Sequence, residues 1–552
     1  MTPPGSCCIV LHGHLPYVHH PDHEDFLEED WYFEAVVETY LPLLHVLDDL
    51  SAEDVPVRMA VGLTPTLLEM FRAPSLAAKF EAYMERRGRL AASEVRRLEG
   101  RPLLHRTALH YAARHGQLLE LHRALGGDLA AGFRRHMEEG RLEILASAAT
   151  HPILPLLATD EGRSAQIRAG AALYHEVFGR PPSGFWLPEC AFSPGLERLL
   201  VEAGIDYVIL ESHGILGARP PSPFGVRRPV RTPAGLRVFG RDQESSRQVW
   251  SAEVGYPGDP VYRELYRDLG FDGHYDYVRE FLHADGLRRN LGFKYHRITG
   301  DVPLHEKEPY DPQAARERAG EHALHFLRSR AEQAERGARS LHQPIIMLSP
   351  YDMELFGHWW YEGPHFLADL FRHMADRERR PRIKLVAPED VLRAGGPCPE
   401  AVPALGTWGR RGYFDVWLSE KNAWLLPHQH EAEMRMIEAA RRRPEREEAT
   451  APILDQMLRE LFLLQSSDWA FIIDHETASH YAEKRAADHL DRFLRLEAAL
   501  RRPDDLDREW FETVRREDAL LPGLDYRLII GGPVSHAERL GTRPRGTPAP
   551  EV

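Results

Sequence analysis

The chain has 552 residues, 43% hydrophobic and 28% charged, which is the composition of a folded globular protein and excludes a disordered or collagen-like chain. Its 69 basic and 84 acidic residues give a net charge of −15, which argues against a globally basic nucleic-acid binder. Four cysteines without a CxxC pair exclude a disulfide scaffold and favour a reducing compartment. With no apolar run of membrane-spanning length and no recognisable signal peptide, we expect a cytoplasmic protein that does not bind a membrane.

Short apolar runs alternate with helical patterns through the first 400 residues. This alternation predicts parallel strands joined by helical crossovers. About seven runs suffice for a barrel; a doubly wound sheet has the same pattern, but no GxGxxG follows the first run. The predicted strands are Cys7–Leu11, Val57–Leu63, Leu142–Ala146, Gly184–Leu187, Tyr207–Leu210, Pro344–Leu348 and Ile383–Val386.

Two regions depart from this alternation. Residues 81–139 carry Leu and Phe at spacings of three and four, which predicts a helical insertion broken near Gly126–Gly127. After residue 401 the strand pattern stops, and apolar stripes of helical period predict an all-helical C-terminal domain over 401–530. The barrel is therefore expected to comprise 1–80 and 140–400, and the Pro/Gly-rich residues 531–552 are expected to be a disordered tail.

Polar residues collect where the predicted strands end. In a barrel of parallel strands these ends share one face, and chemistry occurs there. Four strings put carboxylates, histidines and tryptophans together, as a carbohydrate cleft requires: His12–Tyr17, Trp186–Glu189, Tyr351–Trp360 and Ser466–Trp469.

Glu189 and Asp352 each follow a different predicted strand, and glycosidases use such a pair of carboxyl groups. Taken singly, Glu189 could be an exposed loop residue and Asp352 or Asp468 a helix cap. His12 and His14 form an HxH pair that could bind a metal. Glu211 and His213, which follow another strand, could support the site from behind.

These strings together resemble the family-57 glycoside hydrolases, and within them the 1,4-α-glucan branching enzymes. Further matching stretches are Phe26–Trp31, Ala148–His151, Gln248–Gly258 and Tyr351–Pro364. The resemblance implies an α/β fold, an incomplete seven-stranded (β/α) barrel with a helical insertion and an all-helical C-terminal domain. It also implies retaining chemistry with Glu189 as nucleophile and Asp352 as general acid/base, no metal and no organic cofactor. The residues that it places along a glucan groove are His12, His14, Trp31, His151, Arg241, Trp250, Gly258, Trp360, Trp408, Trp417, Asp468 and Trp469.

The expected activity is transfer of an α-1,4-glucan chain to a 6-hydroxyl acceptor, which makes α-1,6 branches in a glycogen-like glucan; the oligomeric state is not predicted. Alternatives are an α-amylase or 4-α-glucanotransferase on the same scaffold, a metal-dependent polysaccharide deacetylase, and a non-catalytic glucan-binding protein. Trp408 and Trp417 could instead pack between domains, and one of the adjacent Trp359 and Trp360 should be structural. The resemblance also implies a lid with a tyrosine at its tip, and residues 215–240 are expected to form that lid over the mouth. This stretch contains no tyrosine, and if it does not shield the glycosyl ester from water, hydrolysis is favoured over branching.

Overall fold

The computed structural model describes residues 3–251, 254–376, 378 and 380–532. Its centre is a curled sheet whose seven parallel strands run in the order β7-β5-β4-β3-β2-β1-β8. A single parallel bridge between Arg241 and Leu348, reinforced by the Asp242 N–H donating to the Leu348 carbonyl at 2.7 Å, joins the two edge strands. The predicted fold, an incomplete seven-stranded barrel, is confirmed. The seven strands are β1 (Gly5–Gly13), β2 (Met59–Leu63), β3 (Leu142–Ser147), β4 (Gly184–Trp186), β5 (Tyr207–Leu210), β7 (Arg237–Gly240) and β8 (Ile345–Asp352).

The seventh strand is not the one that the sequence predicts. Residues 383–386 contribute only β9 (Lys384–Leu385), which pairs with the beginning of β1 and lies off the main path of the sheet. The barrel instead uses β7, whose sequence RVFG begins with a partly exposed arginine. Only two of its four residues, Val238 and Phe239, carry apolar side chains, so its apolar signal is too short to recognise.

Residues 215–240 do not form a lid, contrary to the expectation. They begin in α9 (Ser212–Leu216), which directly follows the end of β5. They then form β6 (Val230–Arg231), antiparallel to β7, and return to the mouth as β7 itself. Bridges from Arg219 and Arg231 to residues 402 and 400 hold them there. The stretch is part of the barrel wall because its apolar residues, such as Val230 and Val238, are fully buried in that wall.

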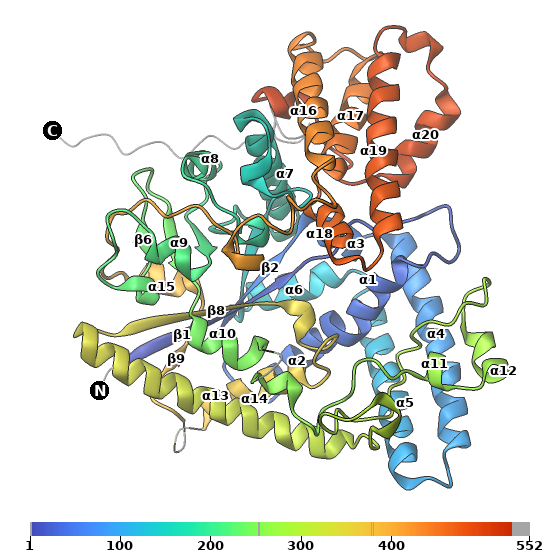
Figure 1. The fold of residues 1–552 in the computed structure, drawn as a ribbon, viewed down its shortest axis with the longest axis vertical. Helices are drawn as coiled ribbons and strands as arrows, with labels where there is room; N and C mark the ends of the chain where they lie inside the picture. The colour runs from blue at the N-terminus through green and yellow to red at the C-terminus, as the bar shows by residue number, and fades with distance from the viewer. Residues whose placement is uncertain (1–2, 252–253, 377, 379, 533–552) are drawn as a thin grey trace.

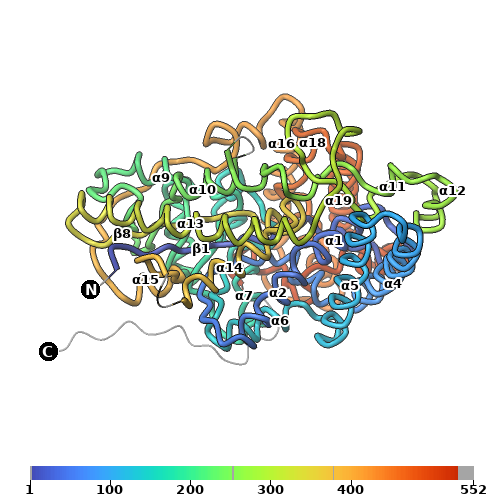
Figure 2. The backbone as a smooth tube through the Cα atoms, turned by 90° about the horizontal axis from the view of Figure 1, so that it is seen from below, coloured from blue at the N-terminus to red at the C-terminus, as the bar shows by residue number. Residues whose placement is uncertain are grey.

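Helices surround the sheet, as Figures 1 and 2 show. The long α13 (Pro312–Leu341) packs beside α14 (Gly363–Ala375), and α14 packs against α2 (Leu41–Ala52). In the helical stretch after β2, α4 (Pro74–Arg97) and α5 (Pro102–Ala124) pack as a pair at one end of the molecule. The predicted break is present: Gly126 and Gly127 take positive φ, and Asp128 caps α6 (Leu129–Glu138), which packs back onto β3.

The remaining helices that precede residue 401 include α1 (Glu29–Ala35), α3 (Pro65–Phe71), α7 (Asp160–Phe178), α8 (Leu196–Glu202), α10 (Gln243–Trp250), α11 (Leu269–Asp272), α12 (Tyr275–Val278) and α15 (Pro388–Ala394).

The C-terminal helices form the upper part of the molecule in Figure 1. They are α16 (Leu425–Arg441), α17 (Ala451–Leu464), α18 (Ser467–His475), α19 (Ser479–Ala499) and α20 (Arg508–Glu517). Helix α17 is almost wholly buried and packs on α19, so it forms the core of this region. Helix α18 reaches the barrel, where the Ser467 N–H donates to the His151 carbonyl at 3.3 Å.

The domain limits at residues 80, 139 and 400 stay predictions, and most of the predicted tail (533–552) lies outside the described residues. Within the described ranges, no helix combines the length and the hydropathy that a membrane span needs.

Candidate active site

Glu189 lies directly after β4, in a short turn where it and Cys190 both take positive φ, 56° and 50°. Such a conformation costs a non-glycine residue about 1–3 kcal/mol and is common at functional sites. The half-buried carboxylate accepts a hydrogen bond from the Trp408 indole N–H at 2.7 Å, and the Trp408 backbone N–H donates to the Glu189 carbonyl at 3.0 Å. Loss of hydration raises the pKa of Glu189 to about 7, although the Trp408 hydrogen bond and the charge of His14 oppose the rise. Glu189 is therefore a positioned carboxyl group, not a free loop residue.

Asp352 ends β8 and lies in register with His12 of β1. Its side chain makes no capping hydrogen bond to the turn that follows, so it is not a helix cap. Desolvation raises its pKa well above the usual range, and the charges of Glu354 and Glu189 add to this rise while Arg241 opposes it. A carboxyl group with so high a pKa holds its proton at neutral pH and can donate it to a leaving oxygen.

Glu354, two residues further on, is a buried carboxyl group that connects three parts of the site. It accepts a hydrogen bond from the His14 backbone N–H at 3.2 Å and a short one from the Tyr40 hydroxyl. Tyr40 belongs to the π-helical turn η1 (Val36–Tyr40), a type of distortion that is frequent at functional sites. Glu354 thus holds the end of β1 in place, and its charge adds to the burial that raises the pKa of Asp352.

Three histidines form a stacked floor beneath the two carboxyl groups. His12 stacks on Trp186 with ring centroids 4.4 Å apart, and His14 stacks on His151 at 3.8 Å. The Nε2 atoms of His12 and His151 are 3.1 Å apart. The stack needs Gly62 on β2, opposite His12, because a Cβ there would lie 3.3 Å from the His12 ring.

Only one of the three histidines of this floor has a raised pKa, so a positive charge is favoured at that position alone. Burial lowers the pKa of His12 and of His151 well below the usual value, so both rings are neutral. Burial also acts on His14, but the charge and hydrogen bond of Asp468, at 3.0 Å from His14 Nε2, outweigh it and raise the pKa. Since His14 Nδ1 contacts Thr64 at 3.1 Å, both of its ring nitrogens are already bonded to protein. His12 and His14 therefore do not present a shared pair of free nitrogens to a metal.

Arg241 connects this floor to an open cleft. Its Nη1 donates to Glu211 at 3.0 Å, its Nε donates to Ser246 at 2.9 Å, and its guanidinium lies 5.7 Å from the Trp408 ring centroid. A cleft of about 600 Å³ opens beside this group and is lined by Trp250, Tyr413 and residues near them. The cleft is polar at its base and aromatic at its sides, which suits a sugar chain that presents both hydroxyls and apolar ring faces.

The family model for glycosyl hydrolase family 57 matches residues 8–402, which is most of the chain. The chain belongs to glycosyl hydrolase family 57. A second model, described as the C-terminal region of 1,4-alpha-glucan branching enzymes, matches residues 428–528.

Individual members of the family support the same assignment. The chain is 34% identical over 521 residues to a 1,4-alpha-glucan branching enzyme of Thermococcus kodakarensis, covering 89% of this chain and 73% of the relative. The crystal structure of a GH57-type branching enzyme from Pyrococcus horikoshii superposes with a TM-score of 0.85 at 31% identity, covering 95% and 97% of the two chains. An α-amylase of Thermotoga maritima superposes with a TM-score of 0.89 at 39% identity, covering 95% and 99%.

The groove residues that the resemblance implied fall into two groups in this family-57 fold. Trp250 is 42% exposed, Gly258 is exposed, and Trp31, Trp408, Arg241 and Asp468 are partly accessible. Trp360, Trp417 and Trp469 are each at most 4% exposed. Trp360 packs among Tyr262, Phe356 and Phe366, so the exposed member of the adjacent pair is Trp359. These three tryptophans are packed inside the protein and do not offer a free ring face to a sugar.

Sequence reasoning missed or undervalued several residues that surround the site: Tyr40, Thr64, Glu354, Trp359 and Tyr413. Trp359 is 46% exposed and packs edge-on against Trp250, with centroids 6.2 Å apart. Tyr413 is 50% exposed at the far side of the cleft. The sequence signals Trp359 and Tyr413 only through local richness in aromatic residues. This richness does not distinguish a packed ring from an exposed one.

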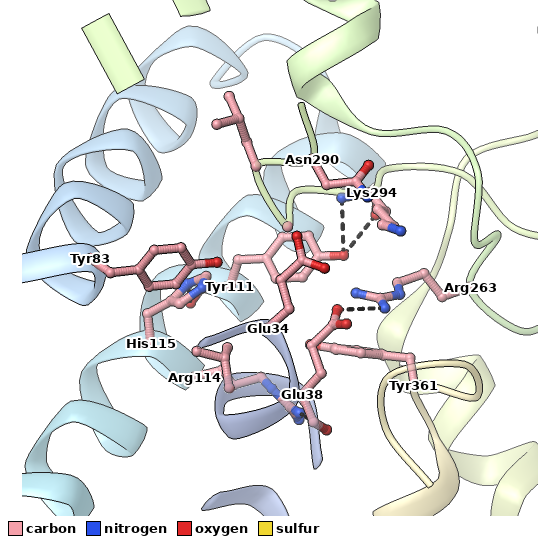
Figure 3. A pocket seen from close by; sticks show the side chains of 13 residues that line it. Glu34, Glu38, Tyr83, Tyr111, Arg114, His115, Arg263, Asn290, Lys294 and Tyr361 are labelled. Atoms are coloured by element: carbon pink, nitrogen blue, oxygen red, sulfur yellow. Dashed lines mark hydrogen bonds and ion pairs between the residues drawn. The ribbon is translucent and has the colours of Figure 1, made fainter. Parts of the chain in front are cut away.

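A second cavity is lined mainly by polar and aromatic side chains, among them Glu38, Arg263 and Tyr361 (Figure 3). Arg263 donates to Glu38 at 2.7 Å, and Glu38 in turn contacts His358, the neighbour of Trp359, at 2.8 Å. The Arg263 guanidinium stacks on Tyr361, 3.9 Å from the ring centroid. This network fixes the 358–361 turn from behind, so the exposed Trp359 stands on a rigid support.

Proposed function

We propose that this family-57 protein is a 1,4-α-glucan branching enzyme, which cleaves α-1,4 links and rejoins the released chain through an α-1,6 link. The observation that carries the proposal is the joint match of the family-57 barrel and the branching-enzyme C-terminal region on one chain. The polar floor and the aromatic cleft suit a glucan substrate. Glycogen-like glucan is the substrate and product class that this activity implies.

The proposed mechanism assigns one role to each carboxyl group. Glu189 attacks the anomeric carbon and forms a glycosyl ester, while Asp352 protonates the leaving oxygen and later deprotonates the acceptor hydroxyl. The electrostatics support this division, because burial and the charges of Glu354 and Glu189 raise the pKa of Asp352 well above its usual range and so favour its protonated form. The Trp408 hydrogen bond and the charge of His14 favour the ionised form of Glu189, as the first step requires. Two displacements at the same carbon would retain the anomeric configuration.

An α-amylase is the second candidate, and the likeness to the Thermotoga maritima α-amylase favours it. Hydrolysis and branching share the glycosyl ester and differ in whether water or a glucan hydroxyl reaches it. Residues 401–424 bear on this choice, because they cross the mouth and put Trp408 on Glu189. The tyrosine-free stretch 215–240 does not, since it belongs to the barrel wall.

Incubation of the purified protein with amylose tests the proposal. Proton NMR measures new α-1,6 linkages, and a reducing-sugar assay on the same samples measures hydrolysis. A branching enzyme forms more α-1,6 linkages than new reducing ends, whereas an α-amylase forms reducing ends with no α-1,6 signal. The Glu189→Gln variant is the matched control, and both signals should be lost in it.

A further inference from the structure

A separate basic cavity of about 150 Å³ lies outside the barrel wall, between α2, α5, α14 and the beginning of α13. Three arginines line it, Arg114, Arg316 and Arg372, and only one carboxylate, Asp49. It shares none of its lining residues with the cleft beside Glu189. Its volume exceeds the roughly 10–15 Å³ that one ordered water requires.

The charges around this cavity are unevenly matched. Arg372 is satisfied, because it donates to Glu53 at 2.7 and 2.8 Å and to Asp369 at 3.0 Å. Within the part of the chain that the structure describes, Arg114 and Arg316 form no ion pair with a carboxylate. Arg114 stacks on Tyr361 at 4.6 Å, and Arg316 contacts the neutral ring of His365. Asp49, the lining carboxylate, is 48% exposed and 3.8 Å from His45.

The histidines of the cavity respond to this excess of positive charge. Burial, then the charges of Arg316 and Arg114, lower the pKa of His365 well below its usual value. Burial and Arg114 lower the pKa of His110 to about 3. Both rings are therefore neutral; His110 Nε2 contacts the Tyr361 hydroxyl at 2.8 Å, and His365 Nδ1 contacts Arg316. Two arginines without carboxylate partners and neutral imidazoles around one small cavity form the donor set of a phosphate-binding site.

We propose that this cavity binds a phosphate group, either as inorganic phosphate or as part of a small sugar phosphate. Arg114 and Arg316 hold the phosphate oxygens by charge-assisted hydrogen bonds, and Arg372, fixed by its own carboxylates, forms the wall. Arg114 also lines the neighbouring cavity of Figure 3, where it lies beside Glu38 and Tyr361. The proposal does not depend on the branching activity, because binding is measured without glucan.

Isothermal titration calorimetry of the full chain with sodium phosphate, at pH 7.5 and constant ionic strength, tests the site. We expect saturable binding to one site, and Arg316→Gln should weaken it about tenfold. Arg328→Gln is the matched control, because Arg328 is exposed on the same helix α13 but does not line the cavity. Asp49→Asn should tighten binding about threefold, since it removes the lining carboxylate; a gain of affinity cannot come from misfolding.

Parallel titrations distinguish the two sources of the phosphate group. Glucose 6-phosphate that binds as well as phosphate, with no binding of glucose, identifies a sugar-phosphate site; its exclusion identifies a site for free phosphate. Sodium chloride should give no saturable heat. The proposal is overturned if phosphate behaves like chloride, or if Arg316→Gln and Arg328→Gln change the affinity equally.

Discussion

The floor and the rim of the active site are built in opposite ways. At the floor, His12, His151 and Trp186 are at most 3% exposed and are held by stacking and hydrogen bonds. At the rim, Trp250 and Tyr413 are 42% and 50% exposed. Glu189 and Asp352 lie between the two, half-buried, where desolvation shifts their pKa values. A rigid floor suits bond breaking, whereas an open aromatic rim suits glucan chains of varied length, so the two regions should respond differently to mutation.

The largest effect is expected at Glu189, where Glu189→Gln should lower kcat by about 10⁴-fold or more, because the proposed nucleophile is lost while the shape is kept. The variant should also be more stable at pH 8, by up to about 3 kcal/mol. The sign follows from a folded-state pKa of about 7 against an ordinary value of 4.5. Below the unfolded-state pKa of 4.5, the Glu189 carboxyl group does not lower the free energy of unfolding of the wild type. Above pH 7 it lowers that free energy by the full amount.

Thermal unfolding of the wild type and Glu189→Gln at pH 4 and pH 8 measures this gain. An equal Tm difference at both pH values would contradict the raised pKa, whatever the loss of activity.

A smaller effect is expected from Trp408→Phe, which keeps an aromatic ring but removes the N–H that donates to Glu189. Hydrogen bonds to charged groups are worth about 1.5–3 kcal/mol, so kcat should fall about 10- to 100-fold. The hydrogen bond lowers the pKa of Glu189, and its loss must raise that pKa. In the dependence of kcat on pH, the acid limb reports the ionisation of Glu189, and this limb should therefore move to higher pH. A lower kcat with an unmoved acid limb would show that the Trp408 hydrogen bond does not set the pKa of Glu189.

Asp468→Asn should move the same limb by a more indirect route. Asp468 raises the pKa of His14, and His14 lowers that of Glu189 more than Asp468 itself raises it. Removal of the Asp468 charge leaves His14 neutral at pH 7, so the acid limb should again move upward, with kcat at pH 7 reduced about tenfold. A shift to lower pH would show that the direct charge of Asp468 dominates.

The smallest effect is expected at the rim. Trp250→Ala should raise KM for amylose about threefold to tenfold and leave kcat within about twofold, because an exposed ring contributes to binding and not to bond breaking. Trp424→Ala is a matched control, since Trp424 is 41% exposed but does not line the cleft. A large loss of kcat in Trp250→Ala would erase the distinction between floor and rim.

The sequence by itself determined the class of fold and the two carboxyl groups, because both depend on local patterns. Apolar runs of four to seven residues mark strands wherever a strand is buried, and parallel strands must present their ends on one face, so His12, His151, Glu189 and Asp352 could be grouped without coordinates. The same reasoning missed β7 and turned residues 215–240 into a lid, because a short edge strand has almost no apolar signal of its own.

Only the tertiary structure decided which aromatic residues face solvent and what state each titratable group is in. Trp359 and Trp360 are adjacent and chemically identical, and it is the packing of Trp360 among Tyr262, Phe356 and Phe366 that leaves Trp359 as the exposed one. His12, His14 and His151 have the same ordinary pKa, and it is the contact of His14 with Asp468, 454 residues away in the chain, that puts the positive charge on one of them. Exposure and charge depend on neighbours from distant parts of the chain, and a local pattern of residues does not contain them.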